Sequence, residues 1–352
     1  MTILYFLILL SVIIVIHECG HLLAAKKFGV YCYEFSFGMG PLLWKKKTAE
    51  TQYSIRAIPM GGYVSMAGEQ DGDELYPDVE VPPGRRITDQ VWWKKIIIMI
   101  AGVTMNFILA WVLFSLVYLS RGVYYVSPES VVGEVQSGLP AETAGFEPGD
   151  RIIAITKEDG SSAKVKTFLD MQVFCADYSG VMTYTVERSG QQLEIEVQPV
   201  YDSESETYRI GIVAEESRAV DINVLNCWYY GGVEMKEIAV LMFRTIGSLL
   251  QGRNLDQLSG PVGIYQATGT YASMGLAAFL FLMAQLSLNV GLFNLLPLPV
   301  LDGGQIVITL CETAVHRELN EKVKLVIMGA CWALLIGLMI FITWNDIAKL
   351  LG

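Results

Sequence analysis

Long runs of apolar residues alternate with polar segments along this chain. The four longest runs extend over residues 2–25, 96–120, 276–301 and 325–345. The last three contain no charged side chain, and each run has the roughly 20 residues that a helix needs to cross the hydrocarbon core of a bilayer. The pattern predicts a polytopic α-helical membrane protein with transmembrane segments over 1–25, 96–120, 276–304 and 325–345.

The first apolar run could also belong to a cleaved signal peptide. Such a peptide carries a basic segment before its apolar core and small residues at its cleavage site, and residues 1–25 have neither. The run also contains His17, Glu18 and His21, which cleavage would remove. We therefore expect it to remain as the first membrane span.

Basic residues predict which ends of the spans face the cytoplasm, because short cytoplasmic loops are enriched in Lys and Arg. Lys26 and Lys27 follow the first span, Lys94 and Lys95 precede the second, and further basic residues lie between the third and fourth. We expect these ends to face the cytoplasm. Both chain termini and residues 121–220 are then on the outer side.

Composition and charge narrow the class of protein. Hydrophobic residues make up 53% of the 352 residues and charged residues only 17%, below the roughly 25% of soluble domains. The net charge of −11 argues against a nucleic-acid partner. Residues 121–220 hold 17 acidic and 8 basic residues, so most of the negative charge belongs to the expected outer domain. The six cysteines are scattered singly, which argues against a disulfide scaffold, and no pair has the Cys-x-x-Cys spacing of a zinc ribbon or redox motif.

Residues 121–220 have the mixed pattern of a small α/β domain. We expect strands over 131–135 and 152–155, a helix over 167–178 and a hairpin over 182–197. Residues 138–142 are expected to open a further short helix that Gly145 closes. The segment PAETAGFEPGDRI, residues 140–152, resembles the circularly permuted PDZ domains of bacteria. PDZ domains bind extended peptide ends along a sheet edge. The alternatives are an α/β domain without a ligand, and a groove that serves only as a steric filter.

The pattern of apolar and charged positions over residues 221–252 predicts an amphipathic helix. Ile238, Leu241 and Leu249 recur at helical spacing, whereas Arg244 in the same stretch makes a full membrane crossing unfavourable. We expect a helix that lies on the outer membrane surface. The alternative is a linker helix that packs against the outer domain.

Two of the three histidines lie in the motif His17-Glu18-Cys19-Gly20-His21, inside the first span. Residues four apart share a face of a helix, so both imidazoles can bind one metal ion while Glu18 lies beside its bound water. Ionisable residues within a membrane span are costly and usually functional. The alternative is a polar cluster that packs the helices without a metal. Cys19 points to another face of the helix, and we interpret it as a packing residue.

Catalytic zinc sites usually have three protein ligands and one open position. His316 and Asp302 are the candidates for the third ligand, and His316 lies beside charged residues in the expected cytoplasmic loop. Asp302 instead follows Pro297 and Pro299, which cannot continue a regular helix. Unwound backbone within a bilayer is tolerated only where it is buried or lines a cavity. The break and the histidine pair are expected at one depth, which favours Asp302.

HECGH in a first span, followed by NLLPLPVLDGG in a later one, resembles the site-2 proteases, a family of intramembrane zinc metalloproteases. The inserted PDZ-like domain makes the chain similar to the RseP-type bacterial members, which act in regulated intramembrane proteolysis. The resemblance implies that His17, His21 and Asp302 bind Zn²⁺. It also implies that Glu18 acts as general base and acid, and that Asn294 is a polar group near the substrate.

The resemblance further implies a membrane-associated β-hairpin region on the cytoplasmic side, over residues 26–95. The segments FGMGP, residues 37–41, and IPMGGYV, residues 58–64, look like the family's hairpin elements. Gly61 and Gly62 are the expected substrate-binding positions there. The edge of such a hairpin can pair with an unwound substrate segment.

One departure from the family lies in the second span. Relatives commonly have Pro where this chain has Val103, which puts a special backbone role at this position in doubt. Asn106 of the same span remains a candidate site residue. The short motif SGPVG, residues 259–263, also matches a family signature.

The resemblance implies an intramembrane metalloendopeptidase of the bacterial cytoplasmic membrane. Its expected substrates are single-span membrane proteins already shortened on the outer side, such as anti-sigma factors, or signal-peptide remnants. The PDZ-like domain would exclude substrates that still carry a bulky outer domain. Two other classes stay open, namely a non-catalytic membrane scaffold that binds partners through its PDZ-like domain, and a metal transporter. The chain shows no internal repeat of the kind common in transporters.

Overall fold

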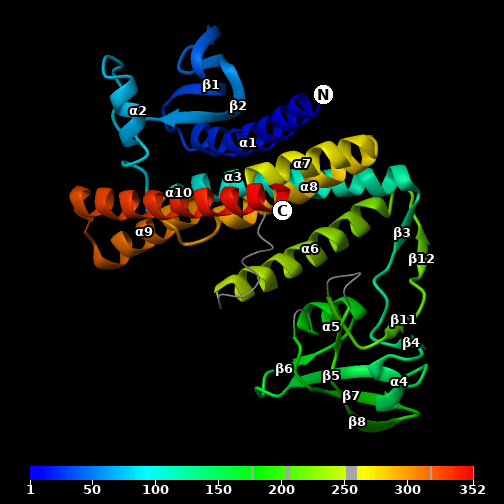
Figure 1. Cartoon of the computed structure of the whole chain (residues 1–352). Coiled ribbons are helices and arrows are strands. Elements are labelled where there is room, and N and C mark those ends of the chain that lie inside the picture. The colour runs from blue at the N-terminus through cyan, green and yellow to red at the C-terminus, as the bar shows by residue number, and fades with distance from the viewer. Residues whose placement is uncertain (176–177, 203–206, 251–259, 318, 352) are drawn as a thin grey trace. The chain divides into compact units, whose positions relative to one another are not determined.

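The computed structural model describes residues 1–175, 178–202, 207–250, 260–317 and 319–351 (Figure 1). The chain divides into two compact units. The larger unit combines Met1–Arg121 with Val224–Gly352, and the smaller unit is Gly122–Asn223. The smaller unit is thus an insertion in the chain of the larger one.

Within the described residues, four helices of the larger unit are long and apolar enough to cross a membrane. They are α1 (Thr2–Lys27), α3 (Trp92–Arg121), α8 (Leu276–Asn294) and α10 (Glu321–Leu351). Their most apolar windows have mean hydropathies between 1.9 and 2.7. α3 lies against both α1 and α8, and the three helices share an apolar core that includes Leu9, Phe114 and Leu288. The predicted spans are therefore observed as helices.

Small residues let the helices of this core approach each other closely. A Cβ atom on Gly20 of α1 would lie 2.9 Å from the Cα of Gly102 and still closer to the carbonyl of Ala101, both on α3. On α8, a Cβ on Gly291 would lie 2.6 Å from the ring of Phe107. Any larger residue at these positions would push the helices apart. Such small-residue contacts are common where helices pack within membranes.

The third apolar run is not one continuous helix. α8 ends at Asn294, residues 295–301 are not helical, and a second helix, α9 (Asp302–Val315), follows. The break coincides with the two prolines that were expected to interrupt the helix. The single segment assigned to 276–304 is therefore divided, and Asp302 is the first residue of the second helix.

The non-helical segment folds against the start of α9. Gly303 and Gly304 leave room for it, because a Cβ on the first would lie 2.5 Å from the carbonyl carbon of Leu295, and a Cβ on the second would collide with the backbone of Leu298. The carbonyl of Leu301 accepts the N–H of Gly304 at 3.0 Å. The close packing at Gly303 and Gly304 thus fixes the position of Asp302, the first residue of α9.

Between α1 and α3 the chain forms an antiparallel hairpin of β1 (Cys32–Lys47) and β2 (Gln52–Met66), followed by the short helix α2 (Gln70–Leu75). The pairing doubles back, because Phe35 of β1 lies opposite both Val64 and Tyr53 of β2. The first half of β1 is therefore flanked on both sides by segments of β2. Both hairpin elements expected from the sequence fall within this sheet.

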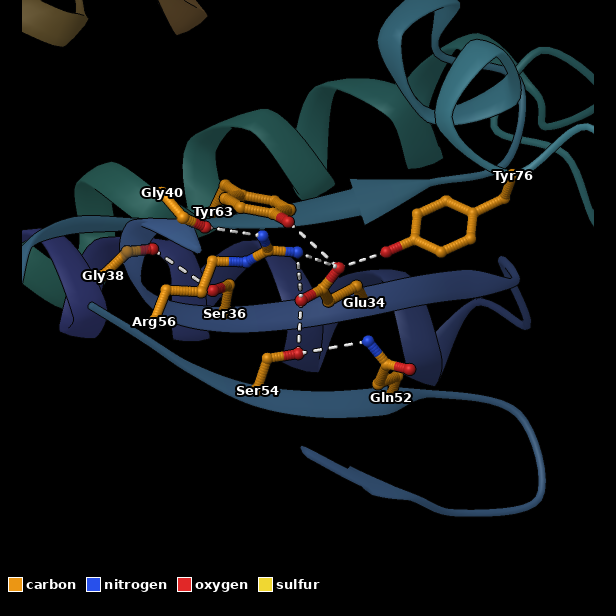
Figure 2. A network of polar contacts seen from close by, with 9 residues as sticks. All are labelled: Glu34, Ser36, Gly38, Gly40, Gln52, Ser54, Arg56, Tyr63 and Tyr76. Carbon is orange, nitrogen blue, oxygen red and sulfur yellow. Dashed lines mark hydrogen bonds and ion pairs between the residues drawn. The ribbon is translucent and has the colours of Figure 1, made fainter. Parts of the chain in front are cut away.

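A buried carboxylate holds the hairpin together, and Figure 2 shows its donors converging from separate segments. Glu34 of β1 is fully buried and accepts hydrogen bonds from four side chains, those of Ser54, Arg56, Tyr63 and Tyr76. Burial raises the pKa of Glu34, but the four hydrogen bonds outweigh burial and leave this pKa below its ordinary value of 4.5. The network joins β1, β2 and the segment after α2.

The amphipathic helix expected after the outer domain is observed as α6 (Cys227–Leu250); residues 251 and 252 lie outside the described residues. α6 belongs to the larger unit and packs against α3, where Trp111 Nε1 donates to the carbonyl of Trp228 at 2.8 Å. This contact ties α6 to the second span. Its position on the membrane surface stays a prediction.

Helix α7 (Pro261–Ser273) begins in the SGPVG motif, of which Ser259 lies outside the described residues. Asp346 of α10 is buried and accepts the N–H groups of Gly260 and Gly263, each at 2.9 Å. A carboxylate at a helix N-terminus satisfies free N–H groups and interacts favourably with the helix dipole. The motif therefore attaches the last span to the rest of the larger unit.

The smaller unit is a mixed α/β fold that contains a four-stranded sheet of order β6-β5-β7-β8. Its elements are β3 (Val123–Tyr125), β4 (Val132–Val135), α4 (Pro140–Ala144), β5 (Arg151–Lys157), β6 (Ser162–Lys164), α5 (Phe168–Cys175), β7 (Met182–Arg188), β8 (Gln191–Val197), β9 (Val200–Asp202), β10 (Thr207–Arg209), β11 (Ile212–Ala214) and β12 (Ala219–Asp221). Ile152, Ile155, Tyr184 and Val186 of the sheet form its apolar core with Phe146 and other buried residues.

Local patterns predict much of this unit. The short helix expected before Gly145 is α4, and Gly145 ends it with a φ of 88°, a conformation that favours glycine. The expected hairpin is β7 and β8. The expected helix over 167–178 is shorter, since α5 ends at Cys175 and residues 176–177 lie outside the described residues.

The chain enters and leaves the smaller unit through two paired strands. β3 and β12 are antiparallel, and Val123 lies opposite Asp221. The two ends of the insertion therefore lie side by side. A short linker can replace the whole unit without separating the helices that precede and follow it.

The Glu34 network makes a prediction for the stability of the hairpin. Glu34→Ala removes the carboxylate that accepts from the Arg56 guanidinium and the Tyr63 hydroxyl, and we expect a local destabilisation of about 3–5 kcal/mol, the usual cost of breaking a buried charge pair. Hydrogen exchange of the amides in β1 and β2 measures this loss. Glu50→Ala removes an ion pair with Arg85 that is partly exposed and should cost about 1 kcal/mol or less.

The same network predicts how the stability of the hairpin changes with pH. Because the pKa of Glu34 lies below its ordinary value, its stabilisation is fully present above the unfolded-state pKa of about 4.5 and is lost as the pH falls through the lowered folded-state pKa. Acid should therefore reduce protection of the hairpin in the wild-type protein more than in Glu34→Gln. Equal acid sensitivity in both proteins would contradict this role.

Candidate metal centre and active site

The two histidines of HECGH lie in the second half of α1, inside the first span. They are one helical turn apart, so their side chains share a face of the helix. Their Nε2 atoms are 3.1 Å apart and their ring centroids 4.7 Å apart. His17 and His21 are each only 8% exposed. A buried pair of imidazoles that converges on one point can form two ligands of a metal ion.

Asp302 brings a carboxylate to the same point from the start of α9. Its Oδ2 lies 3.2 Å from Nε2 of His17 and 3.5 Å from Nε2 of His21. Ligand atoms that each lie about 2.0–2.1 Å from a tetrahedral ion are about 3.3–3.4 Å from one another. The three observed separations of 3.1, 3.2 and 3.5 Å therefore fit a zinc ion at their centre.

The set of donors also suits zinc. Two imidazole nitrogens and one carboxylate oxygen are the ligands of one class of catalytic zinc site, in which the fourth position stays open. Among the described residues, His17, His21 and Asp302 are the group of metal-binding side chains whose ligand atoms converge in this way. Cys19 does not belong to it, in agreement with its interpretation as a packing residue.

Glu18 is held by the β-hairpin. Its Oε2 accepts the backbone N–H of Val64 in β2 at 3.1 Å. About two turns before it on α1, Ser11 Oγ donates to the carbonyl of Pro59 at 2.6 Å, so β2 runs along the helix that carries the histidines. Glu18 is not one of the three converging side chains, and these contacts fix its carboxylate beside the candidate metal site.

The second ring nitrogens of both histidines meet groups of α3. Nδ1 of His21 lies 2.8 Å from the carbonyl oxygen of Ile98, and Nδ1 of His17 lies 3.2 Å from the Asn106 side-chain amide. A carbonyl next to Nδ1 fixes the proton there and leaves the Nε2 lone pair for a metal. α3 therefore orients the His21 ring for metal binding.

Gly102 of α3 makes room for both rings. A Cβ atom at this position would lie 2.7 Å from Cε1 of His21 and 2.9 Å from Cε1 of His17. Contacts this short do not occur, so the rings would have to move. Gly102 therefore serves the site as well as the packing of the two helices.

A family model for peptidase family M50 matches residues 5–338, nearly the whole chain. The chain belongs to peptidase family M50. A protein of Agrobacterium fabrum is 34% identical over 367 residues, which cover 99% of this chain and 96% of that protein. Zinc metalloprotease RasP of Shouchella clausii is 31% identical over 430 residues, and Regulator of sigma-W protease RasP of Bacillus subtilis is 29% identical over 427 residues. Both alignments cover 99% of each chain.

Membership of the M50 family confirms the resemblance to site-2 proteases that HECGH and NLLPLPVLDGG indicate. The chain is a metalloprotease, and its cofactor is zinc. With four apolar helices among its described residues, it is a multi-pass membrane protein.

In this M50 peptidase, Gly61 and Gly62 allow β2 to lie close to α1. Gly61 has a φ of 88°, which favours glycine. A Cβ on Gly62 would lie 2.6 Å from the Ser36 carbonyl oxygen and 3.4 Å from Val15 of α1. The structure thus gives both glycines a role in the backbone of the hairpin, and their expected contact with substrate stays a prediction.

The two remaining candidates lie at helix ends. Asn294 is the last residue of α8, directly before the non-helical segment that leads to Asp302, and it is half-buried. His316 follows the last residue of α9 in a left-handed conformation and is exposed. At 1.5 Å per residue, the length of α9 places it roughly 20 Å from Asp302, so His316 does not reach the metal site.

Sequence reasoning names Asn106 of α3 as a candidate site residue, but it does not identify Ile98 and Gly102. Ile98, Gly102 and Asn106 recur every four residues and form one stripe of the helix, which faces the histidines. A glycine and an amide at this spacing within an apolar span are a usable signal, because polar side chains in a span are costly. The contact between Glu18 and Val64 has no such signal.

The space provided by Gly102 gives a testable prediction. Gly102→Ala should displace both imidazoles, so zinc content and proteolytic activity should fall well below those of the wild-type protein. Gly337→Ala in α10 is the control, because no atom lies within 4 Å of a Cβ added there. Metal analysis of both purified variants makes the comparison. Full zinc occupancy in Gly102→Ala would show that the rings have room to move.

Proposed function

We propose that the chain is an intramembrane zinc metalloendopeptidase that cleaves single-span membrane proteins within the bilayer. His17, His21 and Asp302 are the proposed zinc ligands, and Glu18 is the proposed general base and acid. The observation that carries the proposal is the convergence of three ligand atoms, 3.1–3.5 Å apart, two of them from a helix apolar enough to span a membrane.

Zinc, when bound, supplies a Lewis acid that polarises a carbonyl and lowers the pKa of a coordinated water to about 7. Glu18 takes a proton from the attacking water and returns it to the leaving amine. The water oxygen forms the new bond to the peptide carbon, the C–N bond breaks, and a carboxylate and an amine result. The Val64 N–H holds Oε2 of Glu18, which leaves Oε1 for the proton transfer.

The proposed substrate site is the edge of the hairpin beside α1. Val64 donates its N–H to Glu18, so this N–H points out of the sheet and marks residues 62–66 as an edge next to the catalytic carboxylate. A peptide bond within a helix is inaccessible to a nucleophile, and an unwound substrate segment can add to a sheet edge. Gly61 and Gly62 present no side chains against it. Asn294 is the proposed donor to the substrate backbone or to the developing oxyanion.

The proposed substrates are proteins with one membrane span. One relative is named a regulator of sigma-W protease, which supports anti-sigma factors, already shortened on the outer side, as one class; signal-peptide remnants are another. The proposed location is the bacterial cytoplasmic membrane. The basic residues that flank the spans support a cytoplasmic position for the hairpin and an outer position for the smaller unit.

We propose that the smaller unit is a PDZ-like domain that selects substrates. A cavity of about 500 Å³ lies in this unit, with a lining that includes Phe168 and Leu169 of α5 and Ile212 and Ala214 of β11. β11 pairs with β4 on one side, and among the described strands its other edge is unpaired, as peptide capture requires. The excess of acidic residues in this region disfavours a carboxylate ligand at long range. Exclusion of bulky substrates is therefore the role we favour.

Three substitutions test the assigned roles. Glu18→Gln should keep a wild-type zinc content, because the ligands remain, and should lower cleavage of a membrane-spanning peptide by about 10²-fold or more. Asp302→Asn should lower both zinc content and cleavage, whereas His316→Ala should change neither. Metal analysis and cleavage are measured on the same preparations. Normal turnover by Glu18→Gln, or loss of zinc from His316→Ala, would contradict the assignment.

Removal of the smaller unit tests its proposed role. Because β3 and β12 bring the ends of the insertion together, residues 122–223 can be replaced by a short linker. The shortened protein should cleave a pre-trimmed peptide as the wild type does, and should also cleave a substrate that still bears a folded outer domain. A zinc-loaded protein that still rejects the untrimmed substrate would place the filter elsewhere, for example in α6.

A further inference from the structure

Asn106 is a polar side chain completely enclosed within an apolar span. It lies in α3 and is 0% exposed. Its side-chain Nδ2 is 3.2 Å from Nδ1 of His17, while its Oδ1 is buried and has no hydrogen-bond donor among the described residues. A buried acceptor without a donor costs about 1–3 kcal/mol. A buried oxygen without a hydrogen-bond donor therefore lies on the side chain next to a proposed zinc ligand.

The chemistry of a zinc-bound imidazole provides a donor for this oxygen. When Nε2 of His17 faces the metal, the ring proton lies on Nδ1, which is then a donor. An amide N–H₂ group next to it would place two donors against each other. A half-turn of the Asn106 amide exchanges Oδ1 and Nδ2, and the hydrogen-bond network decides between the two orientations. With Oδ1 toward His17, the acceptor and the Nδ1–H satisfy each other.

We propose that Asn106 is a positioning residue of the zinc site, whose Oδ1 accepts the Nδ1–H of His17. The inference rests on the proposed ligand set. It gives His17 the same kind of partner that His21 has in the Ile98 carbonyl, which lies 2.8 Å from its Nδ1. Histidines that bind metals nearly always donate their second ring N–H in this way, and the partner fixes both the tautomer and the orientation of the ring.

The position of Asn106 on α3 supports this role. Ile98 and Asn106 are eight residues apart, two turns along one stripe of the helix, with Gly102 between them. His21 and His17 are one turn apart on α1 and face this stripe. In this proposal, one side of α3 provides an acceptor for each ring, from Ile98 and Asn106. Gly102 between them leaves the space that the two rings occupy.

The third span holds Asn106 in place. Ser287 of α8 donates its hydroxyl to the backbone carbonyl of Asn106 at 2.9 Å. A Cβ on Gly291, one turn further along α8, would lie 3.5 Å from the Cβ of Asn106. The side chain is therefore enclosed by α1, α3 and α8, and the amide has a fixed distance from the His17 ring. This setting suits a group that must orient a ligand rather than move.

Two substitutions at position 106 distinguish the loss of the hydrogen-bond acceptor from a change in side-chain volume. Asn106→Leu keeps a side chain of similar size and removes the acceptor, whereas Asn106→Asp keeps an acceptor oxygen and removes the amide donor. In the full-length purified protein, zinc affinity is measured by competition with a chelator. We expect Asn106→Leu to weaken zinc binding by about 10- to 100-fold, the usual effect of losing such a partner. Asn106→Asp should bind zinc at least as tightly as the wild type.

A matched control comes from the same helix. Thr104 is exposed on α3 and its hydroxyl bonds only back to the carbonyl of Ile100. Thr104→Val is also an isosteric change from polar to apolar, and it should leave zinc affinity unchanged. Circular dichroism of each variant reports folding separately from metal binding.

The Nδ1–H group of His17 gives a readout that does not depend on activity. The chain has only three histidines, so NMR with ¹⁵N-labelled histidine can resolve His17. In the zinc-loaded wild-type protein its Nδ1–H should show the downfield proton shift of a hydrogen-bonded N–H, and in Asn106→Leu this signal should move upfield. Asn106→Asp should restore the downfield shift.

The outcomes distinguish this inference from the proposed function. Zinc affinity of Asn106→Leu equal to that of the wild type would overturn the inference, as would an Asp variant as weak as the Leu variant, since the amide would then act as a donor or as mere volume. If the wild-type protein itself fails to bind zinc at His17 and His21, the proposed ligand set fails, whatever residue occupies position 106.

Discussion

Contact between α1 and α3 without intervening side chains is the constraint on which the rest of the larger unit depends. Gly20 brings the two backbones together, and Gly102 leaves the space that the imidazoles of HECGH occupy. The Ile98 carbonyl and the Asn106 amide of α3 reach the ring nitrogens only at this separation. A shift by the width of one methyl group would fill the space for the rings or break their hydrogen bonds, because packed interiors do not deform continuously.

The polar groups of this site obtain their partners from elements that are distant in the chain. β2 supplies an N–H to Glu18, α3 places the Ile98 carbonyl beside His21 and the Asn106 amide beside His17, and α9 supplies Asp302. In an apolar environment each polar group must be satisfied by the protein itself. The polar contacts therefore determine how the helices and the hairpin fit together, while the apolar surfaces tolerate many arrangements. The buried carboxylate of Glu34 has the same function within the hairpin.

Features that depend on neighbouring residues could be predicted from the sequence. The four apolar helices, the break at the prolines and the shared face of His17 and His21 follow from periodicity, from proline geometry and from helical spacing. Other features depend on which distant segments meet. The bond from Val64 to Glu18 joins residues 46 positions apart, and the double-sided pairing of Phe35 requires β2 to bend around β1. The helix after Asp302 was also missed, because its polar residues fall outside the pattern of a membrane span.

The placement of Asp302 late in the chain has a consequence for biosynthesis. Asp302 follows His17 by 285 positions, and the intervening segment includes two further spans and the inserted unit. A ribosome-bound chain that has inserted only α1 and α3 presents two imidazoles and no third ligand. With the proposed ligand set, such a chain lacks a complete catalytic centre while other nascent membrane proteins are inserted around it. The proposed centre is then completed only when the segment that carries Asp302 has been synthesised and lies against the two histidines of α1.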